Sequence, residues 1–351
     1  MKNRILALSC LCVLVLNLAG STVGEAAANR VVSAQANQLA TLLPDVDSVV
    51  TIDAKRFFSV AMPKLLSGNP SLLGKVTSGI DQMKADSGVD VRQFDHIAAG
   101  FSVKKAGAKD IDGEPIVIAR GQVSAASMIE SAKAAAKGKH REEKVGDKTI
   151  YLFPPNVVVD QAKKQLPAGT DPTATAKVVS KIPKDIAVTV LDANTIAFGD
   201  ITLVRQTISS QKKAFPPELI SLLAKNETAI VNFAGRMPGG MSSFIPLDND
   251  ELGKNIDSIR LVYGSMDLVG EAVAVNVTAR TLQDAQAKAL QETLEGLQII
   301  GKAFLGGGKG PDKEVYARLI DSAKFSSRAN EVMFDLQIAQ SDIHILVGTL
   351  K

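Results

Sequence analysis

The sequence predicts an α+β protein made of two tandem copies of one unit, in which antiparallel strands joined by hairpins pack against helices. The first observation is an ungapped internal match between residues 114–124 and 271–281. Each of these segments is a strand pattern that ends at Ser or Thr and leads into an Ala-rich helix. Four more pairs match in the same order along the chain: 47–53 with 228–234, 94–101 with 256–263, 194–198 with 330–334, and 200–204 with 342–346.

The second observation is the alternation of short strands and helices in the first unit. The β-branched run at residues 47–53 predicts a strand. Residues 57–83 predict a helix that is interrupted near Gly68-Asn69-Pro70. Residues 97–103 and 115–119 predict two strands of a hairpin, because a polar Gly/Lys/Asp loop joins them.

The second half of the first unit continues with one helix and one more hairpin. Ser124 predicts the N-cap of a helix that runs to Lys137. Residues 186–191 and 195–198 predict strands on either side of a tight turn at residues 192–194. Hairpins of this kind favour an antiparallel sheet over a doubly wound parallel one.

The corresponding helix of the second unit has a clear amphipathic pattern. Thr281 is expected to cap it, and Leu290, Leu294 and Leu297 are expected on one face, because their spacing matches the helical period.

These patterns divide the chain into four parts. The predicted parts are a signal peptide at residues 1–28, an N-terminal tail at 29–45, a first unit at 46–213 and a second unit at 214–351. The first unit carries an insertion at 154–185 that is rich in Pro, Lys, Ala and Thr. Long insertions in surface loops cost little closure entropy, so a surface loop is expected, with a functional lid as the alternative.

The beginning of the chain has the pattern of a secretory signal peptide. Lys2 and Arg4 precede an almost wholly apolar run at residues 5–19, and small residues follow that run. Cleavage after Ala26 or Ala28 is predicted, since small residues occupy the positions that signal peptidase requires.

Two other interpretations of this leader are disfavoured. An uncleaved anchor needs about 20 apolar residues, and Asn17 interrupts a shorter run here. A lipoprotein needs its cysteine at the end of the apolar run, whereas most of the run follows Cys10. Because Cys12 also lies in the leader, the mature protein is expected to contain no cysteine, and no transmembrane anchor after cleavage.

Composition argues against nucleic acid as a partner. The formal net charge is only +3, the chain has no Trp, and just 4% of its residues are aromatic. Nucleic-acid binding requires a basic surface, and binding of single strands commonly requires aromatic stacking platforms as well.

Two local motifs resemble ligand sites but lack essential residues. The glycine-rich stretch 306–311 has Gly310 after Lys309, where a phosphate-binding loop needs Ser or Thr. Residues 248–250 resemble the start of a calcium loop, but the fifth and twelfth positions are Leu252 and Ile259.

Catalytic and metal-binding patterns are equally weak. The three histidines, His96, His140 and His344, have no second ligand at metal-binding spacing and are expected to be surface or cap residues. A G-x-S-x-G nucleophile elbow is absent from the sequence. We therefore predict no catalytic, cofactor-binding or metal-binding residue, and no cofactor.

One short motif suggests a relationship. Leu43-Pro44 followed by the strand at residues 49–53, which ends in Asp, resembles the start of the repeated unit in uncharacterised bacterial exported proteins. The resemblance implies an envelope or secreted protein of unknown function, and it implies no functional residues.

The function expected from these observations is a non-enzymatic one in an exported protein, either periplasmic or secreted. The protein would bind a protein partner or an apolar small molecule, or have a structural role in the bacterial envelope. The alternative is a periplasmic or secreted hydrolase that acts through carboxylates.

Export of the protein should yield a mature N-terminus at Ala27 or Asn29. N-terminal sequencing of the exported protein tests this expectation directly. A chain that still begins at Met1, or one that is acylated at Cys10, would contradict it.

Overall fold

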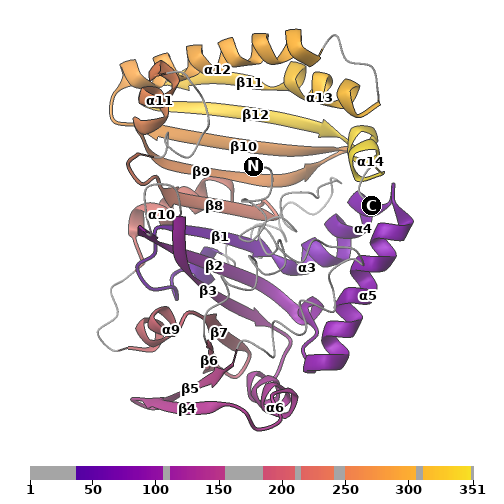
Figure 1. The fold of residues 1–351 in the computed structure, drawn as a ribbon, viewed down its shortest axis with the longest axis vertical. Helices are drawn as coiled ribbons and strands as arrows, with labels where there is room; N and C mark the ends of the chain where they lie inside the picture. Colours follow the sequence, from indigo (N-terminus) through magenta and orange to yellow (C-terminus); the bar gives the residue numbers. More distant parts are fainter. Residues whose placement is uncertain are drawn as a thin grey trace.

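The computed structural model describes residues 37–105, 111–154, 185–209, 215–240, 250–305 and 311–348. The predicted leader, with Ala26 and Ala28, and residues 155–184 of the predicted insertion therefore lie outside the described residues. The described chain is an α+β protein with antiparallel strands, as the sequence predicted, and these strands form one twelve-stranded sheet (Figure 1).

Two strands in the middle of this sheet, β1 (Ser48–Asp53) and β8 (Val231–Arg236), pair with each other. On the side of β1 the strand order continues as β2 (Phe94–Lys105), β3 (Ile111–Gly121), β7 (Thr195–Gly199), β6 (Ile186–Asp192), β5 (Lys148–Phe153) and β4 (Arg141–Val145). On the side of β8 it continues as β9 (Ile259–Val269), β10 (Ala272–Thr281), β12 (Glu331–Ala339) and β11 (Lys324–Arg328).

Read outward from the β1–β8 contact, the first five strands follow the same order in both directions, and the first half then adds β5 and β4. The third strand is β3 on one side and β10 on the other, so Ile116 and Val273 lie in corresponding strands. A duplicated unit requires this order. The duplication itself stays a prediction, since strand order alone does not establish it.

The β4–β5 hairpin was not anticipated from the sequence. The charged run at residues 139–144 gave no alternating pattern, because β4 is an edge strand whose residues are mostly charged. Charges on an edge strand prevent pairing with another chain. Gly146, with a φ of 63°, allows the tight turn that joins the two strands.

The two faces of the sheet differ in polarity. Directly paired residues share a face, and Phe334, Val277, Phe233 and Val50 belong to one row of such pairs. We call the face that bears this row the apolar face. The opposite face, which bears Thr51, is called the mixed face.

Helices line both faces (Figure 1). On the apolar face lie α3 (Ala54–Arg56), the π-helical turn η1 (Phe57–Ala61), α4 (Met62–Leu66), α5 (Pro70–Ser87), α6 (Ala125–Ala135), α12 (Asp284–Leu305), α13 (Pro311–Ser322) and α14 (Gln340–Gly348). On the mixed face lie α9 (Ile201–Ile208), α10 (Pro217–Leu223) and a short helical segment at residues 37–40. The remaining elements are η2 (Val91–Gln93), η3 (Ala224–Asn226) and α11 (Asp250–Asp257).

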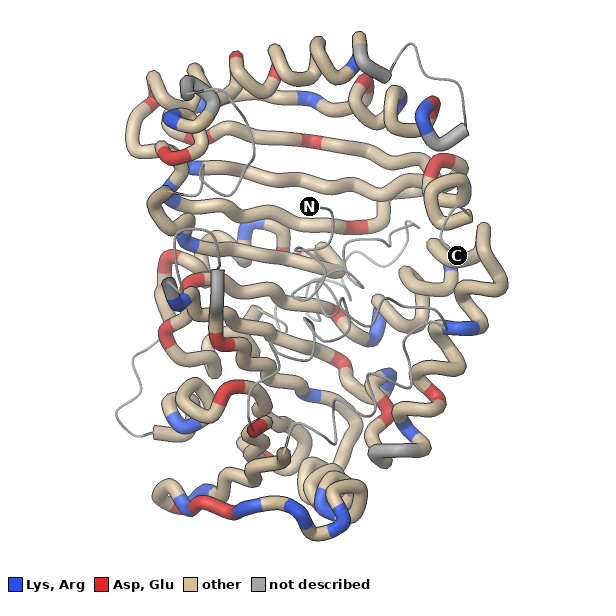
Figure 2. Tube along the Cα trace, viewed as in Figure 1, with Lys and Arg blue, Asp and Glu red and all other residues tan. Residues whose placement is uncertain are grey.

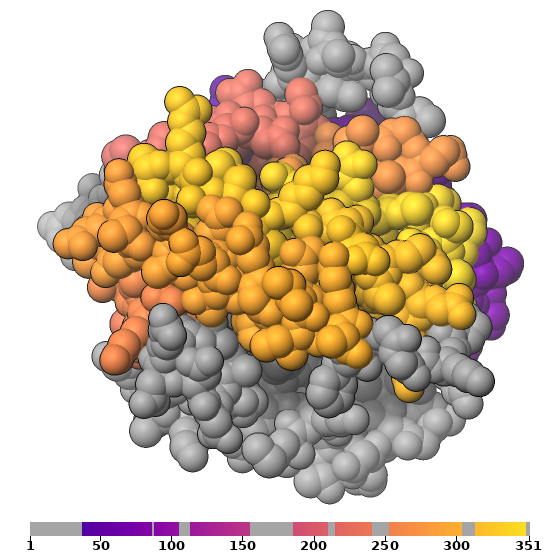
Figure 3. Space-filling model, turned by 90° about the horizontal axis from the view of Figure 1, so that it is seen from above, coloured from indigo at the N-terminus to yellow at the C-terminus, as the bar shows by residue number. Residues whose placement is uncertain are grey.

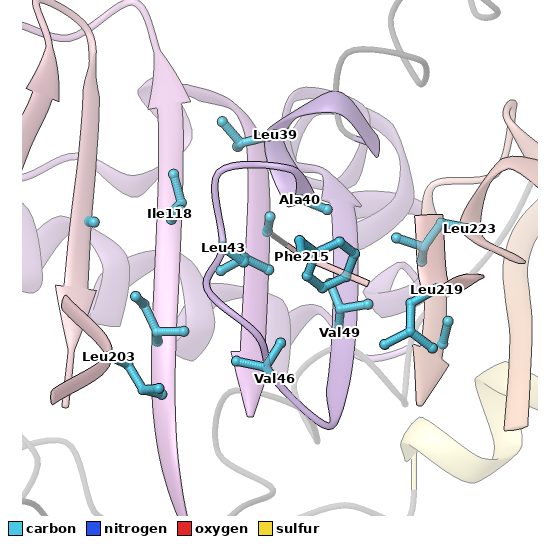
Figure 4. Packing of buried hydrophobic residues seen from close by; sticks show 14 of the residues in the cluster. Leu39, Ala40, Leu43, Val46, Val49, Ile118, Leu203, Phe215, Leu219 and Leu223 are labelled. Carbon is cyan, nitrogen blue, oxygen red and sulfur yellow. The ribbon is translucent and has the colours of Figure 1, made fainter. Parts of the chain in front are cut away.

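The largest hydrophobic cluster lies between the mixed face and its helices (Figure 4). Val49 and Ile118 of the sheet pack with Leu203 of α9 and Leu219 of α10. The cluster also takes in Leu39, Ala40 and Leu43, which belong to the described end of the segment expected as an N-terminal tail.

The helix boundaries show which caps the sequence identified. Ser124 caps α6 by accepting the backbone N–H of Ser127 at 3.2 Å, as predicted. The expected break between α4 and α5 is confirmed, and Asn69 caps α5. Thr281 was wrongly expected to cap α12, because its hydroxyl donates to the carbonyls of Gln283 and Asn330 and the helix begins only at Asp284.

Replacing Ile116 or Val273 with Asp should lower the free energy of unfolding by at least about 3 kcal/mol, because each change places an unpaired charge in a buried strand. Urea denaturation measures the loss. Gln337→Asp is the matched control on the exposed side of β12 and should change stability little. A loss in both core variants no greater than in the control would contradict the observed burial.

Candidate functional site

One described feature that could hold a ligand is an apolar pocket between α12, α13 and the β11–β12 hairpin, with a volume of about 320 Å³. We call it the α12–α13 pocket. Figure 3 shows this end of the molecule from above, with α12 in orange beside the yellow C-terminal elements. The lining residues are Leu294, Leu297, Gln298, Leu319, Ile320, Ala323, Phe325, Phe334 and Leu336.

The floor of the pocket comes from alternate residues of β12. Phe334 and Leu336 are two residues apart and therefore point to the same face of the sheet. Phe325 pairs with Phe334 across the hairpin, and their ring centroids are 5.3 Å apart. The two rings together give the pocket an aromatic end.

Gln298 is the single polar residue among those that line the pocket. Its amide nitrogen donates to the carbonyl of Ile320 at 2.5 Å and to that of Ala323 at 2.8 Å. Both amide hydrogens are thereby used, and Gln298 holds the end of α13 against α12. The pocket therefore presents hydrocarbon to a ligand, without a free side-chain N–H donor.

The outer side of α12 near this pocket is also apolar. Leu297 is 39% exposed, and the neighbouring Ile299 and Ile300 are 68% and 60% exposed. Lys302, one turn after Gln298, forms an ion pair with Asp321 of α13 at 2.7 Å. The pocket thus has an apolar margin, with one ion pair bridging its two helices.

Charged residues are sparse on the strands that lead away from this pocket. Figure 2 shows that Lys, Arg, Asp and Glu lie mainly along the margins of the sheet, and that few lie in the middle of β9, β10 and β12. By register, Asp267 and Asp335 lie on the mixed face, since they pair with Ala274 and Asn276.

A second cluster, at the β1–β8 contact, contains one buried carboxyl group, Asp53, and one partly buried carboxyl group, Asp267. Asp53 ends β1 and accepts the backbone N–H of Arg56 at 2.9 Å. The Arg56 guanidinium donates to Asp267 of β9 at 3.1 Å and to the carbonyl of Thr228 at 2.7 Å. Arg56 thus connects the first helix after β1 to the strands of the second half.

Burial controls the protonation of both carboxyl groups. It raises the pKa of Asp53 and the pKa of Asp267, although Arg56 opposes the shift in both cases. Raised carboxyl pKa values can indicate catalysis when the groups lie in a cleft. The Asp53 side chain is 0% exposed, however, so a substrate cannot reach it. The cluster is therefore best explained as a structural connection between the two halves.

The histidines do not form a common site. His96 was wrongly expected at the surface, because it is buried in β2 directly opposite Asp53. His140 is near Glu142 at 3.4 Å, and His344 contacts Ser67 and Gln340 at the α14–α4 contact. Among the described residues, no group of three or more His, Cys, Asp or Glu side chains could hold a metal ion.

The other motifs from the sequence contribute nothing to the pocket. Gly306–Gly310 and residues 248–249 lie outside the described residues, while Asp250 begins α11. The pocket itself was missed. Leu290, Leu294 and Leu297 indicated the apolar side of α12, but no sequence signal showed that α13 and β12 would leave a space beside it.

Comparison with known proteins adds little. No protein family and no curated protein sequence matches the chain. Crystal form III of TP0453 aligns over 89% of this chain and 98% of that chain, with 8% identity and a TM-score of 0.44. Crystal form I aligns over 89% and 96%, with 9% identity and a TM-score of 0.41. These low scores carry no functional information.

In the part of the chain that the structure describes, no helix combines the length and the apolar character needed to span a membrane.

The stability of the protein should fall in mild acid because of His96. Burial lowers the pKa of His96 despite the nearby Asp53, so native His96 stays neutral while the unfolded chain gains a proton below pH 6.5 or so. Its contribution to the free energy of unfolding should therefore decrease as the pH falls, by at most about 1.4 kcal/mol per pH unit.

Urea denaturation at neutral and mildly acidic pH, compared between the wild type and His96→Gln, isolates this contribution. The variant should lose less stability on acidification than the wild type. Equal losses in the two proteins would show that His96 takes up a proton in the folded state as readily as in the unfolded chain, which would contradict the prediction.

Proposed function

We propose that this chain is an exported, non-enzymatic protein that binds an apolar ligand in the α12–α13 pocket. The observation that supports the proposal is the lining of that pocket, in which eight of nine residues are apolar and the ninth, Gln298, uses both amide hydrogens within the protein. The volume, about 320 Å³, falls at the lower end of the range for small-molecule sites.

Burial of apolar surface supplies the driving force for such binding. It contributes about 25 cal/mol for each Å² of apolar surface removed from water. A polar group of a ligand would lose its water in this pocket without gaining a donor from Gln298, and an unsatisfied polar group costs about 1–3 kcal/mol. The site therefore selects hydrocarbon over polar molecules.

The proposal keeps the expectations that the sequence raised about compartment and origin. A leader cleaved after Ala26 or Ala28 would place the protein in the periplasm or outside the cell. The two halves would derive from one duplicated unit, and the common strand order outward from the β1–β8 contact is consistent with this origin. A protein partner at the exposed Ile299 and Ile300, or an envelope-structural role, is a variant of the same proposal.

A carboxylate-dependent hydrolase is the alternative, and one observation favours it. Asp53 and Asp267 both have a raised pKa and both contact Arg56. A catalytic role would require an accessible carboxylate, which only Asp267, with a side chain 20% exposed, could supply. The buried position of Asp53 makes the binding function the better supported of the two.

Filling the α12–α13 pocket should abolish binding. Ala323→Phe adds a ring inside the pocket and should weaken binding of the apolar fluorophore N-phenyl-1-naphthylamine at least tenfold, because the ring occupies the space of the ligand. Ala303→Phe adds the same ring at an exposed position of α12 and should leave binding unchanged. Fluorescence titration measures both.

Equal binding by the two variants would locate the fluorophore elsewhere and overturn the proposal. Native mass spectrometry of the purified protein provides an independent test. A co-purified apolar molecule that disappears in Ala323→Phe would support the pocket. A molecule retained in Ala323→Phe but lost in Asp267→Asn would instead support the carboxylate site.

A further inference from the structure

Phe334 of the α12–α13 pocket also belongs to a longer row of apolar residues on the sheet. Phe334 pairs with Phe325 of β11 on one side and with Val277 of β10 on the other. The row continues through Gly264 of β9 and Phe233 of β8 to β1. We call the residues from Phe334 to Phe233 the apolar track.

The track lies between two walls that the described helices build. On one side, Val332 and Ala279 pack against α12. On the other side, Val275 and Met266 belong to the cluster that α4 and α14 form with the sheet. Within the described part of the chain, no helix crosses β9 and β10 between these walls (Figure 1).

Where the apolar track crosses β9, the residue is Gly264, so no side chain stands above the sheet at that point. A Cβ atom there would come within 2.6 Å of the Phe233 ring. The Phe233 ring therefore lies over Gly264 and presents an aromatic surface along the track. Three strand spacings separate Phe334 from Phe233, which makes the track roughly 14 Å long at about 4.8 Å per strand.

We infer that the ligand of the proposed binding site is an amphiphile with a straight alkyl chain, whose tail fills the α12–α13 pocket and the apolar track together. This inference rests on the proposed function. A long floor with walls on both sides accommodates an extended chain better than a compact ring system. The side chains of the track carry no polar atom, so the head group stays in solvent.

The experiment measures the affinity of the wild-type protein for saturated straight-chain carboxylates from octanoate to octadecanoate. Each methylene buried should raise affinity about fourfold, the equivalent of about 0.8 kcal/mol. The increase should continue beyond the chain length at which the pocket alone is filled. The primary alcohol of the same length should bind within about threefold of the carboxylate, since head groups in solvent contribute little binding energy.

A block in the track should shorten the accepted chain. Val277→Phe places a ring between the pocket and Phe233 and should stop the increase in affinity at a shorter chain length, while the shortest carboxylates still bind as to the wild type. Asn276→Phe places the same ring on the exposed opposite face of β10 and should behave as the wild type. Val277→Leu is the milder variant if Val277→Phe unfolds, as circular dichroism would show.

An increase that ends at the same chain length in the wild type and the Val277 variants would overturn the track and leave the pocket as the whole site. Binding of the carboxylates but not the alcohols would overturn the placement of the head group in solvent. Failure of both the carboxylates and N-phenyl-1-naphthylamine to bind the wild type would overturn the proposed function itself.

Discussion

Strands β1 and β8 pair antiparallel from Ser48 to Ile52, and the continuity of the whole sheet depends on this pairing. One backbone hydrogen bond extends the pairing at each end. These bonds run from Asp53 N to Ile230 O at 2.9 Å and from Arg236 N to Asp47 O at 2.7 Å. The two half-sheets thereby become one continuous sheet. A row of apolar residues can therefore run from the pocket in one half to β1 in the other.

Arg56 reinforces the same contact at an energetic cost. It connects Asp53 to Asp267, two carboxyl groups whose raised pKa values show that burial opposes their charge. Replacement of buried ion pairs by apolar residues is often neutral or stabilising in other proteins. The cluster therefore contributes a defined geometry at the contact between the halves more than it contributes stability.

The two halves use their faces differently, and this difference explains where the pocket forms. On the mixed face of the first half, the paired residues Ala98 and Ile118 are buried under helices. On the same face of the second half, the paired residues Asn276 and Asp335 are exposed. The second half instead has its longest helix on the apolar face. This helix, α12, has 22 residues, whereas α6 on the same face of the first half has only 11. The longer α12 reaches α13, and Gly301 allows close packing against Ile320. The pocket lies between these two helices and the strands.

The sequence by itself determined the α+β class, the hairpins at β2–β3 and β6–β7, the break before Pro70 and the cap at Ser124. These features depend on local period and on turn or cap chemistry, which neighbouring residues specify. Only the tertiary structure decided that β1 joins β8, that His96 is buried opposite Asp53, and that Arg56 contacts Asp267. The α12–α13 pocket was also decided only by the tertiary structure, because α12, α13 and β12 meet there. A pocket is the space that packed side chains leave unfilled, and its existence depends on how distant segments fit together.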